Sequence, residues 1–232
     1  MNKQVLFNRL IVTTEWITRI CFSNIIWLLF NLPIIYFAFN LLVSTNPNQL
    51  ITNMLFIIIL SPFLFFPSTT ALFGITRKWV MGELDIKLIK SFFKYYKENY
   101  IRSVIGGLLL TVLWVFLFID YFYFSTINSP IFYLFLAVGI FMLAFTINFF
   151  SITVHYEVKL FPTLKNCFQL ALGRPVHTIG IAAITIITVY ISFNLPFLLL
   201  LGTGSIIAYS CFKIFNLGLN SNGENDQKDD ND

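Results

Sequence analysis

Residues 77–102, RKWVMGELDIKLIKSFFKYYKENYIR, are the longest interruption in an otherwise apolar chain. They hold seven of the fifteen Lys and Arg residues, and long apolar runs lie on both sides of them. Basic loops between apolar runs are typical of the cytoplasmic side of membrane proteins. The stretch therefore predicts an all-α fold, a polytopic transmembrane helical bundle with residues 77–103 as its main cytoplasmic loop.

The composition also indicates a membrane protein. Of 232 residues, 57% are hydrophobic and only 11% are charged, and the mean hydropathy is +0.79. Soluble domains carry about 25% charged residues. The net charge of +4 lies beside the apolar runs, where membrane topology accounts for it, so we expect no nucleic acid partner.

The basic loop divides at Gly82. Before it, residues 68–70 can cap a short helix that runs to about residue 81, and Gly82 suits the left-handed position that ends a helix. A second helix is predicted from residue 85 to about residue 100. In it, four lysines fall within an arc of about 80°, and apolar and aromatic residues fill the opposite half. This pattern predicts an amphipathic interfacial helix in the headgroup layer. The candidate contacts with lipid or a partner are Arg77, Lys78, Trp79, Lys87, Lys90, Lys94, Lys97 and Arg102. The alternative is that these charges only set the topology and solvate one helix face.

Six apolar stretches are the predicted spans of a hydrocarbon layer about 30 Å thick. They cover residues 20–43, 50–70, 104–124, 131–154, 178–193 and 196–212. Together they form one transmembrane domain, 20–215, after an amphipathic cytoplasmic lead-in, 1–19, with a second cytoplasmic loop at 155–177 and a disordered, acidic cytoplasmic tail at 216–232. The candidate helix breaks are Pro33, Pro62, Pro67 and Pro196.

The distribution of basic residues favours six spans over five. With the amino terminus inside, six spans place all fifteen Lys and Arg residues on the inner side, whereas five would put Lys213 and the tail outside. We therefore expect a multi-pass protein of the cell membrane with both termini in the cytoplasm. The bilayer, with its anionic inner leaflet, is the first expected partner.

Three stretches carry a resemblance to a known family: NIIWLLFNLPII at 24–35, FPSTTALFGITRKWVMGE at 66–83 and FFKYYKENYIRSVIGG at 92–107. Their order resembles the YesL-like family of bacterial membrane proteins, a domain of unknown function. In that family an N-x-x-W-L-L…L-P span precedes P-x-x-T-A-L, R-K-W-x-x-G-E and F-F-x-x-[FY]-K-x-N-[FY] elements. The family often has Gly-Pro where this chain has Phe66-Pro67.

The resemblance implies an integral membrane protein of Gram-positive bacteria, often encoded beside genes for sugar uptake and glycan degradation. A carbohydrate ABC transporter is therefore a further expected partner. The resemblance brings no catalytic residues.

The residues themselves give no pattern typical of an enzyme. Asp120 is expected outside, whereas His155 and His177 are expected inside, about 30 Å away across the bilayer. No nucleophile elbow and no glycine-rich phosphate loop is present, and the three cysteines have no partner at metal-ligand spacing. We expect no catalytic, metal or cofactor site, and no cofactor.

Transport is the main alternative function. The predicted spans contain no Lys, Arg or Glu, which disfavours proton or sodium coupling through a carboxylate. F-N-L-P occurs twice, at 30–33 and 193–196, but the two copies are expected at different depths, so we interpret them as proline kinks with satisfied Asn side chains and not as paired broken helices. The interpretation favoured by the sequence is a non-enzymatic accessory or regulatory component associated with carbohydrate uptake. The alternative is a small-solute transporter or channel.

Overall fold

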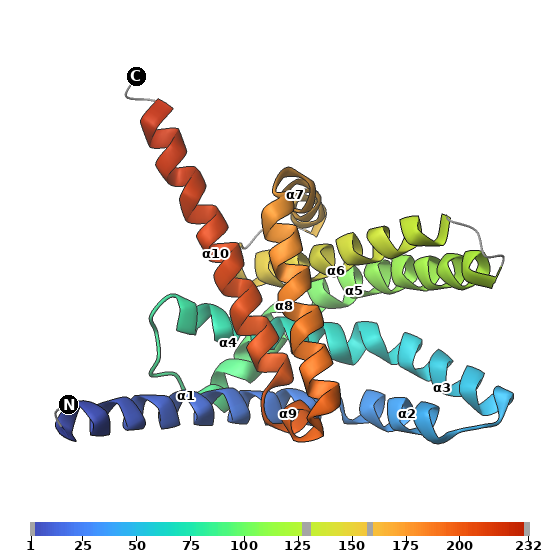
Figure 1. Cartoon of the computed structure of the whole chain (residues 1–232), viewed down its shortest axis with the longest axis horizontal. Coiled ribbons are helices and arrows are strands. Elements are labelled where there is room, and N and C mark those ends of the chain that lie inside the picture. The colour runs from blue at the N-terminus through green and yellow to red at the C-terminus, as the bar shows by residue number, and fades with distance from the viewer. Residues whose placement is uncertain (1–2, 127–130, 157–159, 230–232) are drawn as a thin grey trace.

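The computed structural model describes residues 3–126, 131–156 and 160–229, and these residues form only helices and their connections (Figure 1). Side chains are described at residues 4, 7, 9–126, 131–156 and 160–219. The elements are α1 (Lys3–Phe30), α2 (Leu32–Val43), α3 (Pro47–Leu60), the π-helical turn η1 (Ser61–Phe65), α4 (Phe66–Val80), α5 (Leu88–Thr126), α6 (Ile131–His155), α7 (Leu160–Gly173), α8 (Pro175–Asn194), α9 (Pro196–Leu201) and α10 (Thr203–Asp229). The predicted all-α class is confirmed.

Four helices are long and apolar enough to cross a membrane: Pro47–Val80, Leu88–Thr126, Ile131–His155 and Pro175–Asn194. A fifth candidate span is the pair Arg9–Phe30 and Leu32–Val43, which is bent by 78°. The predicted sixth span falls on α9 and the beginning of α10. In Figure 1, α8 and α10 cross the direction of α5 and α6, so the predicted spans are not all parallel. The count of six remains a prediction.

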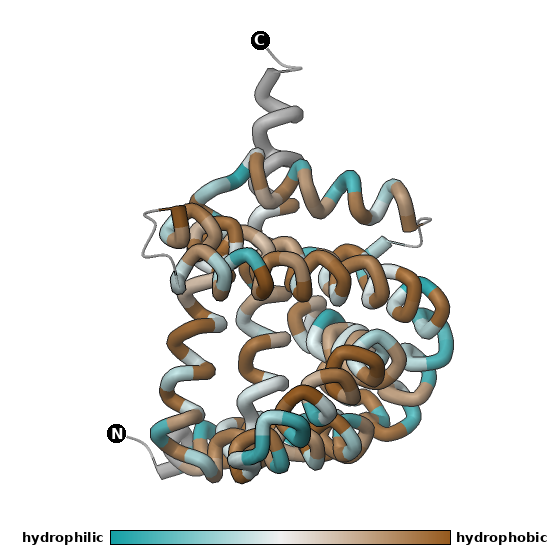
Figure 2. The backbone as a smooth tube through the Cα atoms, turned by 90° about the vertical axis from the view of Figure 1, so that its right-hand side faces the viewer, coloured by the Kyte–Doolittle hydropathy of each residue, from teal (hydrophilic) through white to brown (hydrophobic). Residues whose placement is uncertain are grey.

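Large apolar side chains cover much of the outer surface. Leu42, Ile101 and Phe116 are among many that are more than half exposed. Figure 2 shows that hydrophobic residues run along most of the helices, with hydrophilic ones scattered between them. Such a surface is consistent with a membrane protein, because lipid tails cover it without cost.

Two of the four predicted helix breaks occur and two do not. Pro33 lies in the first turn of α2, directly after the bend at Asn31, and Pro196 is the first residue of α9. Pro62 lies instead in η1, where the Phe66 N–H donates to the Ser61 carbonyl, and Pro67 continues into α4. A π turn is wider than an α turn, so the chain passes both prolines as one 34-residue helix.

Residues 68–70 lie inside α4, although the sequence suggested that they begin a helix. Their hydroxyls join α4 to its neighbours. The Asn31 amide donates to Ser68 at 2.9 Å, the Trp27 indole to Thr69 at 3.1 Å and Ser103 to Thr70 at 2.8 Å. Hydrogen bonds of this kind hold membrane helices together where apolar burial gives no driving force. Most residues of α4 are buried, so this helix lies in the interior of the bundle.

The lysine-striped helix and the predicted third span are a single helix, α5, of 39 residues. Phe92 of α5 is completely buried, and Phe30 packs on it at 5.0 Å between ring centroids. Part of the apolar face of this helix, opposite the lysines, therefore packs against the rest of the protein. A headgroup position for this segment remains a prediction.

The acidic end of the chain continues α10 to Asp229 in a stretch for which the composition predicts disorder. Its side chains beyond residue 219 are not described, and the predicted character of this tail stays a prediction.

Gly107 allows α5 to pack closely on Phe66, the first residue of α4. A Cβ atom there would lie 2.7 Å from Cγ and 2.9 Å from Cβ of Phe66, which is itself buried. We expect Gly107→Ala to lower the free energy of unfolding by about 1–3 kcal/mol, although alanine favours helices. Thermal unfolding of the purified protein in detergent measures this change. Gly139→Ala is the matched control, because its Cβ would meet only Leu117 at 3.6 Å. An equal melting temperature for Gly107→Ala and the wild type would contradict the packing.

Candidate anion-binding site on the basic face

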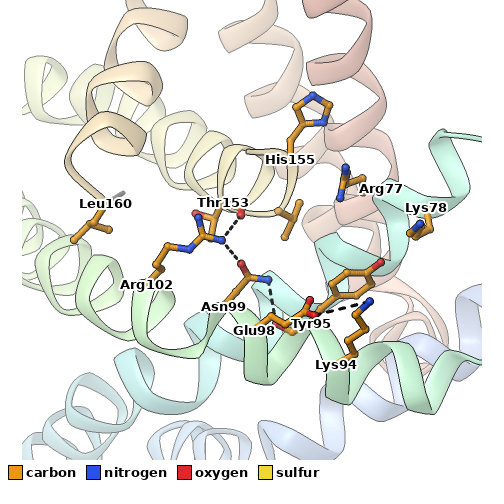
Figure 3. Close-up of a pocket in the computed structure, with 11 residues that line it drawn as sticks. Arg77, Lys78, Lys94, Tyr95, Glu98, Asn99, Arg102, Thr153, His155 and Leu160 are labelled. Carbon is orange, nitrogen blue, oxygen red and sulfur yellow. Dashed lines mark hydrogen bonds and ion pairs between the residues drawn. The ribbon is translucent and has the colours of Figure 1, made fainter. Parts of the chain in front are cut away.

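An open cavity of about 1010 Å³ lies where α4 and α6 end and α5 begins (Figure 3). Its lining residues are Arg77, Lys78, Lys94, Tyr95, Glu98, Asn99, Arg102, Thr153, Val154, His155 and Leu160. Four of these carry a positive charge and one, Glu98, a negative charge. We call this surface, together with Lys87, Lys90 and Lys97 on α5 and its preceding turn, the basic face.

Arg102 holds the carboxyl end of α6. Its Nη1 donates to the Tyr156 carbonyl at 3.1 Å, and its Nη2 donates to the Thr153 carbonyl at 3.1 Å and to Oδ1 of Asn99. The last carbonyls of a helix have no partner within it and carry partial negative charge, so a guanidinium there satisfies both needs. Arg102 thus serves the fold, by tying α5 to α6.

Lys78 is held by the turn that ends α4. The Glu83 N–H donates to the Lys78 carbonyl at 2.9 Å and the Gly82 N–H donates to the Trp79 carbonyl at 3.1 Å, which is a Schellman motif with Gly82 at φ +88°. This confirms the predicted role of Gly82. The same turn brings the Glu83 carboxylate within 2.6 Å of Lys78 Nζ.

Lys94 reaches Glu98 one helical turn away, at 3.8 Å. Both side chains are more than half exposed. Such a pair stabilises a protein little, so Lys94 remains available to another anion.

Arg77 and His155 face each other at one wall of the cavity (Figure 3), close enough for the Arg77 charge to act on the imidazole. Arg77 Nε and His155 Nδ1 are buried and have no hydrogen-bond partner among the described residues. Phe212 and Phe215 of α10 pack around the imidazole, with centroid distances of 6.2 and 5.7 Å. Among the described residues that line the cavity, these two nitrogen atoms are the buried side-chain polar atoms without a partner.

The remaining candidate contacts separate into two groups. Lys87, Lys90 and Lys97 are exposed and form no ion pair among the described residues. Trp79 is 3% exposed and packs edge-to-face on Trp16 at 6.0 Å, away from any surface. The sequence interpretation missed Tyr95 and Asn99, and it treated His155 as an ordinary loop residue, because no sequence pattern reveals that α6 ends beside α5.

No three His, Cys, Asp or Glu side chains come together as a metal site within the described part of the chain. Cys167 on α7 is fully buried, and burial raises the pKa of its thiol far above its ordinary range. That thiol stays protonated and is a poor nucleophile.

A second polar cluster lies at the break between α9 and α10. The Asn24 amide donates to the Leu199 and Leu200 carbonyls at 2.9 and 2.8 Å, and its Oδ1 accepts from the Gly204 N–H at 3.0 Å. Ser23 and Ser205 are also hydrogen-bonded, at 2.8 Å. Asn24 therefore satisfies its own groups and those of the break, and it leaves nothing for a ligand.

Arg102 is bound within the fold, whereas Arg77 Nε has no partner among the described residues. Removing each side chain tests this difference. Because Arg102→Ala leaves helix-end carbonyls and Asn99 without a donor, we expect it to lower the free energy of unfolding by about 1–3 kcal/mol. Arg77→Ala removes a side chain whose Nε has no partner, and we expect a change below about 0.5 kcal/mol. Thermal unfolding in detergent compares the two. Equal losses of stability would contradict the assignment.

Comparison with known proteins connects the chain to one family. The family model described as "Protein of unknown function, DUF624" matches residues 20–121. The uncharacterized protein YesL of Bacillus subtilis is 24% identical over 201 residues, which cover 86% of this chain and 84% of YesL. YteU of the same organism is 25% identical over 209 residues, which cover 89% of this chain and 83% of YteU. No solved structure matches the chain.

These matches confirm the resemblance to the YesL-like family that the motifs in residues 24–107 indicate. They also extend it, because the alignments with YesL and YteU cover most of the chain.

Proposed function

We propose that this YesL-like protein is a non-enzymatic accessory protein of the cell membrane, and that its basic face contacts an anionic surface during carbohydrate uptake. The observation that carries the proposal is the stripe of Lys87, Lys90 and Lys97. All three are exposed and unpaired among the described residues, on a segment continuous with a candidate span.

Electrostatics supports a surface contact for this stripe. Each Lys or Arg close to an anionic lipid surface contributes about 1 kcal/mol. Lys90 and Lys97 lie on α5, which is anchored through buried Phe92, and Lys87 directly precedes this helix, so the fold presents the three side chains together at little further ordering cost. In the proposed orientation the basic face and both termini are cytoplasmic, as the distribution of Lys and Arg indicates.

The association with carbohydrate uptake rests on the family resemblance alone, and it specifies the partner as a carbohydrate ABC transporter. The non-enzymatic part rests on chemistry. Catalysis requires convergent acid, base or nucleophilic groups. In the described cavity the one carboxylate, Glu98, lies beside Lys94, and the other side chains are mostly basic.

A small-solute transporter is the second candidate, and the helix breaks favour it. α1 and α2 meet at Asn31 with a bend of 78°, and the break at Gly202 lies against α1 through Asn24. Broken helices in contact are a feature of transporters. Solute flux into liposomes that contain only this protein would support this candidate over the accessory function.

The accessory function predicts a specific companion. We expect the tagged protein, purified from its own membranes in mild detergent, to retain a permease or ATPase subunit of a carbohydrate importer in fixed proportion. Quantitative mass spectrometry measures this ratio. Lys90→Glu/Lys97→Glu should reduce it about tenfold or more, since it reverses two charges of the stripe.

Lys165→Glu/Lys213→Glu is the matched control. It reverses the same number of exposed lysines, on α7 and α10, and should leave the ratio unchanged. A clean homo-oligomer, or a companion retained equally by all three proteins, would contradict the proposed function.

A further inference from the structure

The cavity holds basic groups of two kinds, which differ in what already binds them. Arg102 is hydrogen-bonded to two helix-end carbonyls and to Asn99, and Lys78 is paired with Glu83. These groups are explained by the fold. Arg77 and His155 are not, because Arg77 Nε and His155 Nδ1 are buried and lack partners among the described residues.

An unused buried donor is costly, and two basic side chains side by side repel each other when both are charged. Within the described residues the nearest carboxylate on the lining, Glu98, reaches Lys94 instead. One anion placed between Arg77 and His155 would accept a hydrogen bond from each and would remove the repulsion. The arrangement is therefore complementary to a group that the described residues do not supply.

We propose that the wall formed by Arg77 and His155 binds a phosphate group, either of an anionic lipid or of a free phosphate compound. A guanidinium matches the tetrahedral oxyanion with parallel donors, and an imidazole N–H supplies a third. Lys94, on the floor of the cavity, adds positive charge, and the Tyr95 ring lies beside it (Figure 3).

The size and lining of the cavity favour a phosphate that carries an organic group. Its volume of about 1010 Å³ is at the upper end of ligand sites, far more than an inorganic ion fills. Val154 and Leu160 give the rim an apolar part, which suits either the glycerol of a lipid or the body of a small metabolite.

This inference goes beyond the proposed function and does not depend on it. Lys87, Lys90 and Lys97, which carry the proposed contact with a partner, do not line the cavity. Loss of phosphate binding and loss of the partner can therefore be observed separately.

The test uses the full-length protein in nanodiscs. In one arm the lipid is phosphatidylcholine alone, and inorganic phosphate and glycerol 3-phosphate are titrated by calorimetry. In the other arm the nanodiscs contain phosphatidic acid or phosphatidylglycerol, and native mass spectrometry counts the lipids retained. Saturable binding in the first arm assigns the site to free phosphates, and selective retention in the second assigns it to a headgroup. Either result supports the proposal.

Variants make the test specific. We expect Arg77→Gln and His155→Gln each to weaken binding about tenfold or more, and Arg77→Lys, which keeps the charge but loses the planar fork, to give an intermediate loss. Lys165→Gln removes an equal charge from an exposed position on α7, outside both the cavity and the lysine stripe, and should change binding less than about twofold. Melting temperatures near that of the wild type establish that the variants are folded.

Two outcomes would overturn the proposal. One is the absence of saturable binding in both arms. The other is an equal loss for Lys165→Gln and Arg77→Gln, which would mean that the net charge of the protein, and not this wall, attracts the anion.

Discussion

The need to satisfy every backbone polar group at a helix end or break controls this structure. In a bilayer the protein must supply those partners itself, because lipid tails supply none. Asn24 does so at the break between α9 and α10, with two carbonyls and an N–H bound to one amide. Arg102 does so at the end of α6. Each of these side chains comes from a different helix, so satisfying a break also fixes two helices relative to one another.

The same constraint determines which basic side chains of the basic face are free to bind a partner or a ligand. Arg102 binds the end of α6 and Lys78 binds Glu83, so two groups of basic side chains on this face remain without a described partner. One is the exposed lysine stripe on α5, which suits a broad anionic surface. The other is the half-buried pair Arg77 and His155 on the wall of the open cavity, which suits a single oxyanion. A count of charges in the sequence cannot separate them, because the separation depends on the carbonyls and carboxylates that each cation meets.

Much of the fold follows from the sequence where the signal is local. The all-α class, the helix end at Gly82 and the breaks beside Pro33 and Pro196 depend on residues that are adjacent in the chain. The features that could not be predicted depend on contacts between residues far apart in the sequence, or on a local adjustment of the backbone. Pro62 and Pro67 are carried through by a π turn instead of breaking the helix, and residues 68–70 bond to other helices instead of capping their own. The cavity requires α6 to end beside α5, which no single stretch encodes.

The proposed contact between the basic face and a partner requires that face to lie in the cytoplasm, and thiol accessibility tests this requirement most directly. In a variant whose native cysteines are replaced by alanine, Lys90→Cys reports on the basic face and Thr45→Cys on the turn between α2 and α3; both positions are exposed. A membrane-impermeant thiol reagent should label Thr45→Cys in intact cells and Lys90→Cys only after the cells are permeabilised. Labelling of Lys90→Cys in intact cells would place the basic face outside and would contradict the account.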